Sequence, residues 1–153
     1  MRNRAIYMQK IGVVTAGGDA PGMNAAILSV VRTAIFNWLK VVGIERGHAG
    51  LIEEKIRPLN ARSVSGIINR GWTVLRTARC EKIKMEEGAL TAQSRILVNQ
   101  FGAHAVELLL KEVKKRMVGV KGKKIVSVDL NCSWQQKKNI DEQLYSLAEI
   151  VSA

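Results

Sequence analysis

Cysteine, proline, aromatic residues and long apolar runs are all scarce in this sequence. Its 153 residues include two cysteines and two prolines. The cysteines have neither CxxC spacing nor a nearby pair of histidines, so no disulfide framework and no zinc site are expected. No run approaches the roughly 20 apolar residues of a membrane-spanning helix, and charges interrupt the N-terminus before a signal-peptide core accumulates. We therefore expect a soluble, cytoplasmic chain with no membrane partner and with reduced thiols.

Acidic residues are also few, because 13 Asp and Glu stand against 24 Lys and Arg, which gives a formal charge of +11. More than half of this excess lies between residues 111 and 124, a segment we call the basic run. Such a run usually marks a solvated helix end and hairpin, and the alternative is a module that binds polyanions. A nucleic-acid partner is not expected, since aromatic residues make up 5% of the chain and none falls in the run.

The residues that are abundant suit one folded domain, with 47% hydrophobic content. The apolar run Ile11–Thr15 predicts a buried strand, and a glycine-rich turn follows it. Apolar residues then recur at helical spacing over Ala25–Leu39, and Val41–Ile44 predicts a second strand. Strand, turn, helix and strand form a βαβ unit, which requires a parallel sheet and predicts the α/β class.

The remainder of the chain predicts a looser region and then further elements. Gly47 and Gly50 indicate turns. The other predicted elements are a short helix capped by Ser63, a strand at Trp72–Leu75, a helix from a Thr91 cap to about Lys115 that Gly102 weakens, a hairpin of Met117–Val120 and Ile125–Leu130 around a four-residue loop, and a helix from about Asn139.

The glycine-rich turn, Ala16 to Asn24, is the first candidate site. Glycines between a strand and a helix N-terminus let a phosphate approach backbone N–H groups. The turn lacks the Gly-Lys-Ser/Thr of a P-loop and the GxGxxG dinucleotide spacing. A plain tight turn, in which glycine only supplies positive φ, explains the residues equally well. Asp19, the acid of the turn, is expected to be a helix cap rather than a base.

Longer stretches carry a family resemblance. The segments IGVVTAGGDAPGMNAA, VVGIERGHAGLIE, RSVSGIINRG and LRTARCE closely resemble the N-terminal part of ATP-dependent 6-phosphofructokinases. The segments LTAQSRILVNQFGAHAVELLL, RMVGV and KIVSVDL resemble the C-terminal end of the same family. The resemblance therefore implies a partial Rossmann-like phosphofructokinase fold, with residues 1–87 and 88–153 corresponding to two ends of a longer enzyme whose middle is missing.

The resemblance also implies site residues and ligands. It places the family's nucleotide contact on Gly18, with Gly17 beside it, and a triphosphate-binding arginine on Arg79, followed by Cys80. Of the two basic positions in the family's allosteric nucleotide site, one matches Arg32 and the other is Leu28 here. The family transfers the γ-phosphate of ATP to fructose 6-phosphate in glycolysis, with Mg²⁺, usually in a nucleotide-regulated homotetramer.

Three segments that the resemblance leads us to expect do not occur in this sequence: a second Gly-Gly-Asp-Gly loop for nucleotide and magnesium, Thr-Ile-Asp-Asn-Asp for the base, and His-Ile-Gln-Arg for the sugar phosphate. We therefore expect no catalytic residues, no metal site and no sugar-phosphate binding. The chain is predicted to be inactive alone or only weakly nucleotide-binding, with a non-catalytic docking module as an alternative.

Four aromatic side chains receive structural interpretations only. Trp38 and Trp72 stand where the resemblance predicts small residues, so they are either new core residues or signs of relaxed packing. His48 and His104 lack an evident acidic partner and are expected to be structural.

Overall fold

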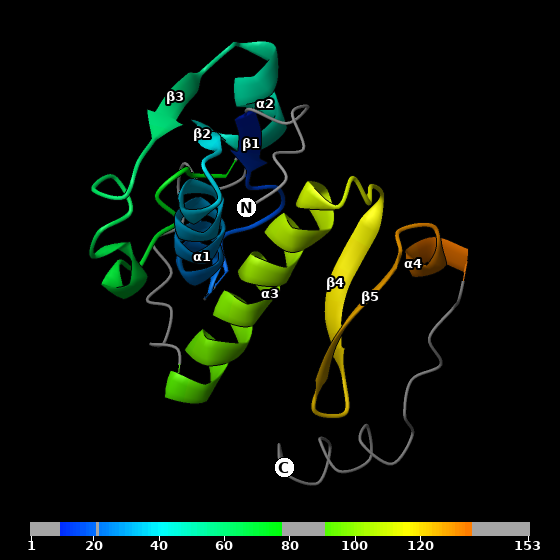
Figure 1. Cartoon of the computed structure of the whole chain (residues 1–153). Coiled ribbons are helices and arrows are strands. Elements are labelled where there is room, and N and C mark those ends of the chain that lie inside the picture. Colours follow the sequence, from blue (N-terminus) through cyan, green and yellow to red (C-terminus); the bar gives the residue numbers. More distant parts are fainter. Residues whose placement is uncertain (1–9, 21, 78–90, 136–153) are drawn as a thin grey trace, which may run out of the picture.

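The computed structural model describes residues 10–20, 22–77 and 91–135. Figure 1 shows these residues as one α/β layer followed by a long helix and a separate hairpin. In chain order the elements are β1 (Lys10–Val14), α1 (Met23–Phe36), β2 (Lys40–Ile44), α2 (Gly47–Ile52), β3 (Ile56–Leu59), the 3-10 turn η1 (Ile67–Asn69), α3 (Ala92–Leu110), β4 (Arg116–Lys121), β5 (Lys124–Asp129) and α4 (Cys132–Gln135).

The predicted βαβ unit is present. β1 and β2 pair in parallel, with Ile11 opposite Val41 and Val14 opposite Ile44, and α1 connects them. The sheet also has a third strand that the sequence did not reveal, because β3 is short and contains Pro58. β3 pairs antiparallel to β2 at the edge of the sheet, where a missing backbone N–H is tolerated.

The core lies between this sheet and the helices. Ile11 of β1 and Val41 of β2 pack with Val31 of α1, which is completely buried. Val106 of α3 belongs to the same cluster, so the chain beyond residue 90 contributes to the core of the first unit. The full cluster consists of Ile11, Ile27, Val31, Ala34, Leu39, Val41, Leu59, Val64, Ile67, Leu75 and Val106.

Helix α1 ends three residues before the predicted Leu39 because the chain forms a Schellman motif. The N–H of Leu39 donates to the carbonyl of Ala34 at 3.0 Å, and that of Trp38 donates to Ile35 at 2.9 Å. The motif places Trp38 at φ 65°, a position that glycine normally fills. Trp38 is 86% exposed and Trp72 is 64% exposed, so the interpretation of these two tryptophans as core residues is wrong.

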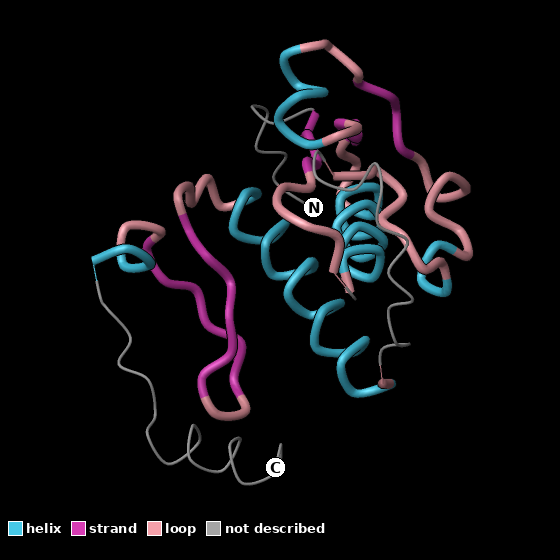
Figure 2. Tube along the Cα trace, turned by 180° about the vertical axis from the view of Figure 1, so that it is seen from behind, coloured by secondary structure: helices cyan, strands magenta, loops and turns pink. Residues whose placement is uncertain are grey.

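Helix α3 begins at the predicted cap, since the Thr91 hydroxyl accepts a hydrogen bond from the Ser94 N–H at 3.1 Å. It lies between α1 and the β4–β5 hairpin, as the front and back views both show (Figures 1 and 2). Gly102 marks the close crossing with α1, because a Cβ there would lie 2.8 Å from the Cβ of Ser29. The glycine that was expected to weaken the helix is therefore required by its packing.

The hairpin is confirmed, but its turn is shorter than predicted. Lys121 pairs with Lys124, which leaves Gly122 and Lys123 as a two-residue turn. Gly122 has φ 62° at the first central position, the geometry for which type II′ turns select glycine. Neither β4 nor β5 contains a buried residue.

Three other local predictions are wrong. Gly47 and Gly50 lie inside α2 rather than in turns. Ser63 does not cap a helix, because it exchanges hydrogen bonds with Asn60, and Gly66 precedes η1 instead. Residues 72–75 form an irregular loop and not a strand. The helix predicted from Asn139 lies outside the described residues. Within the described ranges, no helix has both the length and the apolar character needed to cross a bilayer.

Candidate functional site

The glycine-rich turn joins the carboxyl end of β1 to the N-terminus of α1. Gly17 and Gly18 are both exposed, and a Cβ added at either position would meet no atom within 4 Å. Gly17 has φ 91°, a conformation that glycine adopts without strain. The first turn of α1 contains no acidic residue. The backbone of this turn is thus open to solvent next to the positive end of a helix, an arrangement that suits an anion.

Asp19 does not cap α1, contrary to expectation. The residue at the N-cap position is Gly22, which has no side chain to offer. The carboxylate of Asp19 instead accepts hydrogen bonds from Thr73, from its backbone N–H at 3.1 and 3.2 Å and from its hydroxyl. Thr73 is almost completely buried and lies 54 positions further along the chain. The acid of the turn is therefore bound to a distant loop.

Asn24 makes a second connection to the same loop, which spans residues 70–76. Its side-chain amide donates to the carbonyl of Trp72 at 2.8 Å and lies 3.4 Å from that of Arg70, while its oxygen accepts from the Val74 N–H at 2.9 Å. Asn24 is itself buried. A buried amide that is paired on both sides holds the loop in one position, since breaking either bond would leave an unsatisfied group.

Thr15 completes the set, because its hydroxyl donates to the carbonyl of Arg76 at 2.6 Å. We call Thr15, Asp19 and Asn24, together with their partners in the loop, the polar clamp. The three side chains lie at the start, middle and end of the turn, and together they form hydrogen bonds with loop residues between Arg70 and Arg76.

The polar clamp explains why residues 72–75 do not form a strand. Several of the loop's backbone groups bond to side chains and to other backbone groups instead of to a strand ladder. The N–H of Arg46 donates to the carbonyl of Leu75 at 2.9 Å, and Arg57 donates to that of Val74 at 3.4 Å. The side chain of Leu75 is completely buried. Sequence reasoning missed this site because its signal was only two polar residues, Thr15 and Asn24, flanking the glycines.

The other predicted site residues are divided between two parts of the chain. Arg79 and Cys80, as well as the boundary near residues 87 and 88, lie outside the described residues. Arg32, the candidate effector residue, is an exposed side chain on α1. Leu28, one turn earlier, packs against the core instead of facing a ligand.

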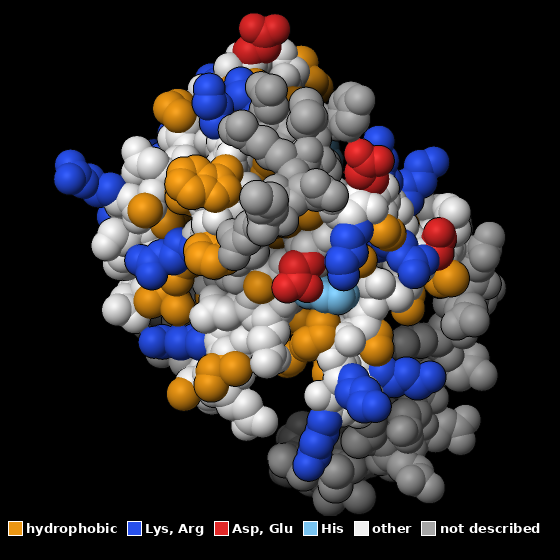
Figure 3. All heavy atoms as spheres, viewed as in Figure 1, with side chains coloured by type: hydrophobic (Ala, Val, Ile, Leu, Met, Phe, Trp, Pro, Cys, Tyr) orange, Lys and Arg blue, Asp and Glu red, His pale blue; other side chains and the backbone are white. Residues whose placement is uncertain are grey.

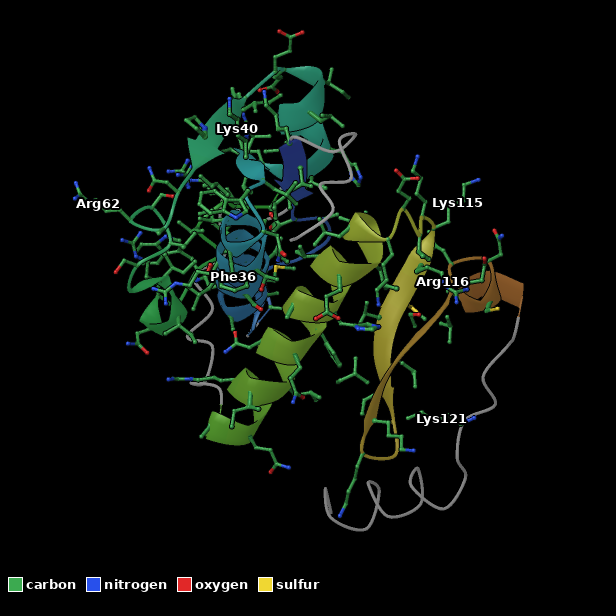
Figure 4. The ribbon with its side chains drawn as sticks, in the orientation of Figure 1. Phe36, Lys40, Arg62, Lys115, Arg116 and Lys121 are labelled. Carbon is green, nitrogen blue, oxygen red and sulfur yellow. The ribbon has the colours of Figure 1, made fainter. Side chains whose placement is uncertain are left out.

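The basic run does not form one patch. Lys115 and Arg116 lie at the end of the hairpin next to α3, whereas Lys121 lies at its turn (Figure 4). Arg116 and Lys121 are the first and last residues of β4, so about 16 Å separates the two groups. Figure 3 likewise shows Lys and Arg side chains scattered over the visible face. The run, continuous in sequence, is split in space into one group at the start of β4 and another around Gly122.

His104 does have an acidic neighbour, contrary to the sequence interpretation. Its Nδ1 lies 3.5 Å from a carboxylate oxygen of Glu107, one turn later on α3. Across the part of the chain that the structure describes, no group of three or more His, Cys, Asp or Glu residues could hold a metal ion. The open turn suits the phosphates of a nucleotide.

Comparison with known proteins adds to this geometry. A sequence model described as Phosphofructokinase matches residues 10–112, which include β1, the glycine-rich turn, the polar clamp and α3. The chain belongs to the phosphofructokinase family. The predicted resemblance is thus confirmed over the N-terminal segment and into the C-terminal one.

Similar proteins of the phosphofructokinase family are considerably longer than this chain. The chain is 45% identical over 136 residues to the ATP-dependent 6-phosphofructokinase of Halothermothrix orenii, covering 82% of itself and 40% of that protein. It is 58% identical over 81 residues to the enzyme of the same name from Alkaliphilus metalliredigens, covering 53% of itself and 25% of that protein. The chain thus spans less than half of the relatives it matches.

A solved structure also matches the chain, that of the Pichia pastoris phosphofructokinase in the T-state. It is 30% identical with a TM-score of 0.45, and the match covers 70% of this chain and 11% of that one.

Proposed function

We propose that this chain binds the phosphates of a nucleotide, with ATP as the expected ligand, at the turn between β1 and α1. The observation that carries the proposal is the open backbone at Gly17 and Gly18 beside the N-terminus of α1, locked to loop 70–76 by the polar clamp. The similarity to proteins named ATP-dependent 6-phosphofructokinase supports ATP as the nucleotide.

Arg79 and Cys80 complete the proposed site, with Arg79 as the phosphate-binding cation. The clamped loop ends three residues before Arg79 in the sequence. A guanidinium forms paired, charge-assisted hydrogen bonds with phosphate oxygens, so it would neutralise charge that the glycine turn alone leaves exposed. Arg32 is proposed as the remnant of an effector site, which Leu28 leaves with one basic residue.

We further propose that the chain alone does not transfer phosphate to fructose 6-phosphate. Phosphoryl transfer needs a metal to bridge phosphates and a residue to position the attacking hydroxyl. The three sequence segments expected to supply these groups are absent from the sequence. A phosphate site that lacks the residues of its second side also admits water, and water weakens the electrostatic contacts inside the site. The chain is then a non-catalytic, cytoplasmic remnant made of segments 1–87 and 88–153.

Titration calorimetry with ATP tests the binding proposal. We expect saturable binding by the wild type, and at least about tenfold weaker binding after Arg79→Ala, because a charged hydrogen-bond donor is lost. Arg62→Ala is the matched control, since Arg62 is an exposed arginine on the loop between β3 and η1, away from the glycine-rich turn. Equal affinities of wild type and Arg79→Ala would contradict the proposed role of Arg79.

A coupled assay for fructose 1,6-bisphosphate tests the second part. We expect no turnover above that of a heat-denatured sample, with or without added Mg²⁺. Measurable product formation by the purified chain would overturn the proposal that it is inactive alone.

A polyanion-binding function gains no support, because the hairpin divides the basic run between its two ends. A site for a long anion needs a continuous line of positive charge along the surface.

A further inference from the structure

The turn proposed to bind phosphate contains a negative charge. Asp19 is the one acidic residue in the described part of the turn, directly after Gly17 and Gly18. A free carboxylate at this place would repel a nucleotide phosphate. Both oxygens of Asp19 are instead engaged by Thr73, whose N–H and hydroxyl both donate to them. The carboxylate therefore has a defined partner on the opposite loop.

The apolar core already attaches loop 70–76 to the fold. Leu75 is completely buried and lies against Gly43, where a Cβ added to the glycine would lie 2.5 Å from the Leu75 Cδ2. The carbonyl of Leu75 also accepts a backbone hydrogen bond from Arg46. These contacts hold the loop to β2 and do not involve the glycine turn. The contribution of Asp19 and Asn24 is thus separate: their bonds fix the loop relative to the turn.

We propose that Asp19 and Asn24 are positioning residues of the nucleotide site. Through Thr73, Trp72 and Val74 they hold the glycine turn and loop 70–76 in the relative position that binds phosphate. This inference rests on the proposed function. Binding to a preorganised pair of loops avoids the entropy of ordering them, so cutting the polar clamp lowers nucleotide affinity while the core keeps the chain folded.

Three substitutions cut the polar clamp in different ways. Asn24→Ala removes its three hydrogen bonds to the loop backbone. Asp19→Asn removes the charge but keeps an oxygen that accepts from the Thr73 N–H. Thr73→Val removes only the hydroxyl and is the variant least able to disturb folding. Asn60→Ala is the matched control, because Asn60 makes a comparable side-chain bond to the Ser63 N–H at 2.8 Å, away from the turn.

Each variant is titrated with ATP and with inorganic tripolyphosphate, and thermal unfolding verifies that it is folded. The direct readout is the amide shift of Gly17 and Gly18 in nitrogen-15 NMR spectra, which a merely stabilising residue would not alter in the folded protein. We expect shifts in the wild type and the control, and affinities about tenfold weaker in the three clamp variants.

The outcomes separate the two proposals. If wild type and folded clamp variants bind ATP equally, the positioning role is wrong and the proposed function stands. Tighter binding by Asp19→Asn would also overturn the positioning role, because the carboxylate would then only repel phosphate. If the wild type itself shows no binding and no shift at Gly17 and Gly18, the proposed function fails, and the inference fails with it. If the Asn24→Ala variant does not fold, the ATP affinity of the Thr73→Val variant tests the positioning role.

Discussion

The βαβ unit and the β4–β5 hairpin both contain apolar residues but bury them very differently. Val31 in the first region is completely buried, as is Leu75 of the loop that packs against β2, whereas no residue of either hairpin strand is buried. A two-stranded hairpin has only marginal stability in water unless something covers one of its faces. The buried core thus forms where helices cover the sheet, and α3 packs against both α1 and the hairpin.

The largest effect is expected at Leu75. Leu75→Ala removes a fully buried side chain from a loop that has no regular structure, and the loss should be about 2–5 kcal/mol of unfolding free energy. Leu130→Ala, next to the hairpin and 41% exposed, should cost about 0.5 kcal/mol or less. Urea unfolding of both variants measures the difference, and similar losses would remove the distinction between the two regions.

A glycine-to-alanine change should lower the stability more at the crossing of α3 with α1 than in the hairpin. Gly102→Ala introduces a Cβ at 2.8 Å from the Ser29 Cβ and 3.0 Å from the Ala26 carbonyl oxygen, which forces α3 and α1 apart. We expect a loss of about 1–3 kcal/mol. Gly119→Ala in β4 meets no atom within 4 Å and should change stability by about 0.5 kcal/mol or less.

Thermal unfolding of the Gly102 and Gly119 variants at equal concentration is sufficient for this test. A Gly102→Ala protein as stable as the wild type would mean that the helix crossing is looser than the structure shows.

Substitutions at two turn positions with positive φ should change the stability in opposite directions. Trp38→Gly should raise the stability by about 1 kcal/mol, because a bulky residue at φ 65° is strained and Trp38, being 86% exposed, contributes little packing. Gly122→Ala should lower it by about the same amount, since φ is 62° there as well. Denaturant midpoints measure both, and a destabilised Trp38→Gly variant would show that the indole makes a contact worth more than the strain.

The smallest effect is expected from a surface ion pair. The hydrogen bond from Lys55 lowers the pKa of Glu53, and the charges of Lys55 and Arg46 act in the same direction. A lowered pKa in the folded state stabilises the protein above the ordinary pKa of the carboxyl, and this contribution disappears as the pH falls through the lowered value.

In the Lys55→Met variant, stability should therefore fall less steeply as the pH is lowered. Stability at neutral pH should be almost unchanged, because exposed ion pairs contribute little. Thermal midpoints between about pH 3 and 7 measure this slope. An unchanged slope would show that Lys55 does not set the pKa of Glu53.

Local pattern was sufficient for the elements whose apolar residues have a clear period. The strand near Ile11, helix α1, the Thr91 cap and the hairpin were all predictable, as was the glycine turn as a candidate site. Pattern failed where distant groups replaced local ones. The loop at Trp72 reads as a strand because it is apolar, yet its backbone bonds go to side chains about 50 residues away. β3 was missed because Pro58 argues against a strand everywhere except at an edge.

By itself, the sequence determined the parallel βαβ unit, the phosphofructokinase family and the candidate residues Gly17 and Gly18. The βαβ unit follows from the periodicity of apolar residues, whereas the family and the two glycines follow from the resemblance of whole segments to phosphofructokinases. Only the tertiary structure decided that Asp19 binds Thr73 rather than capping α1, that Gly102 is a packing requirement, and that the basic run is split across the hairpin. The physical reason is common to all three, because each depends on which group lies opposite in space.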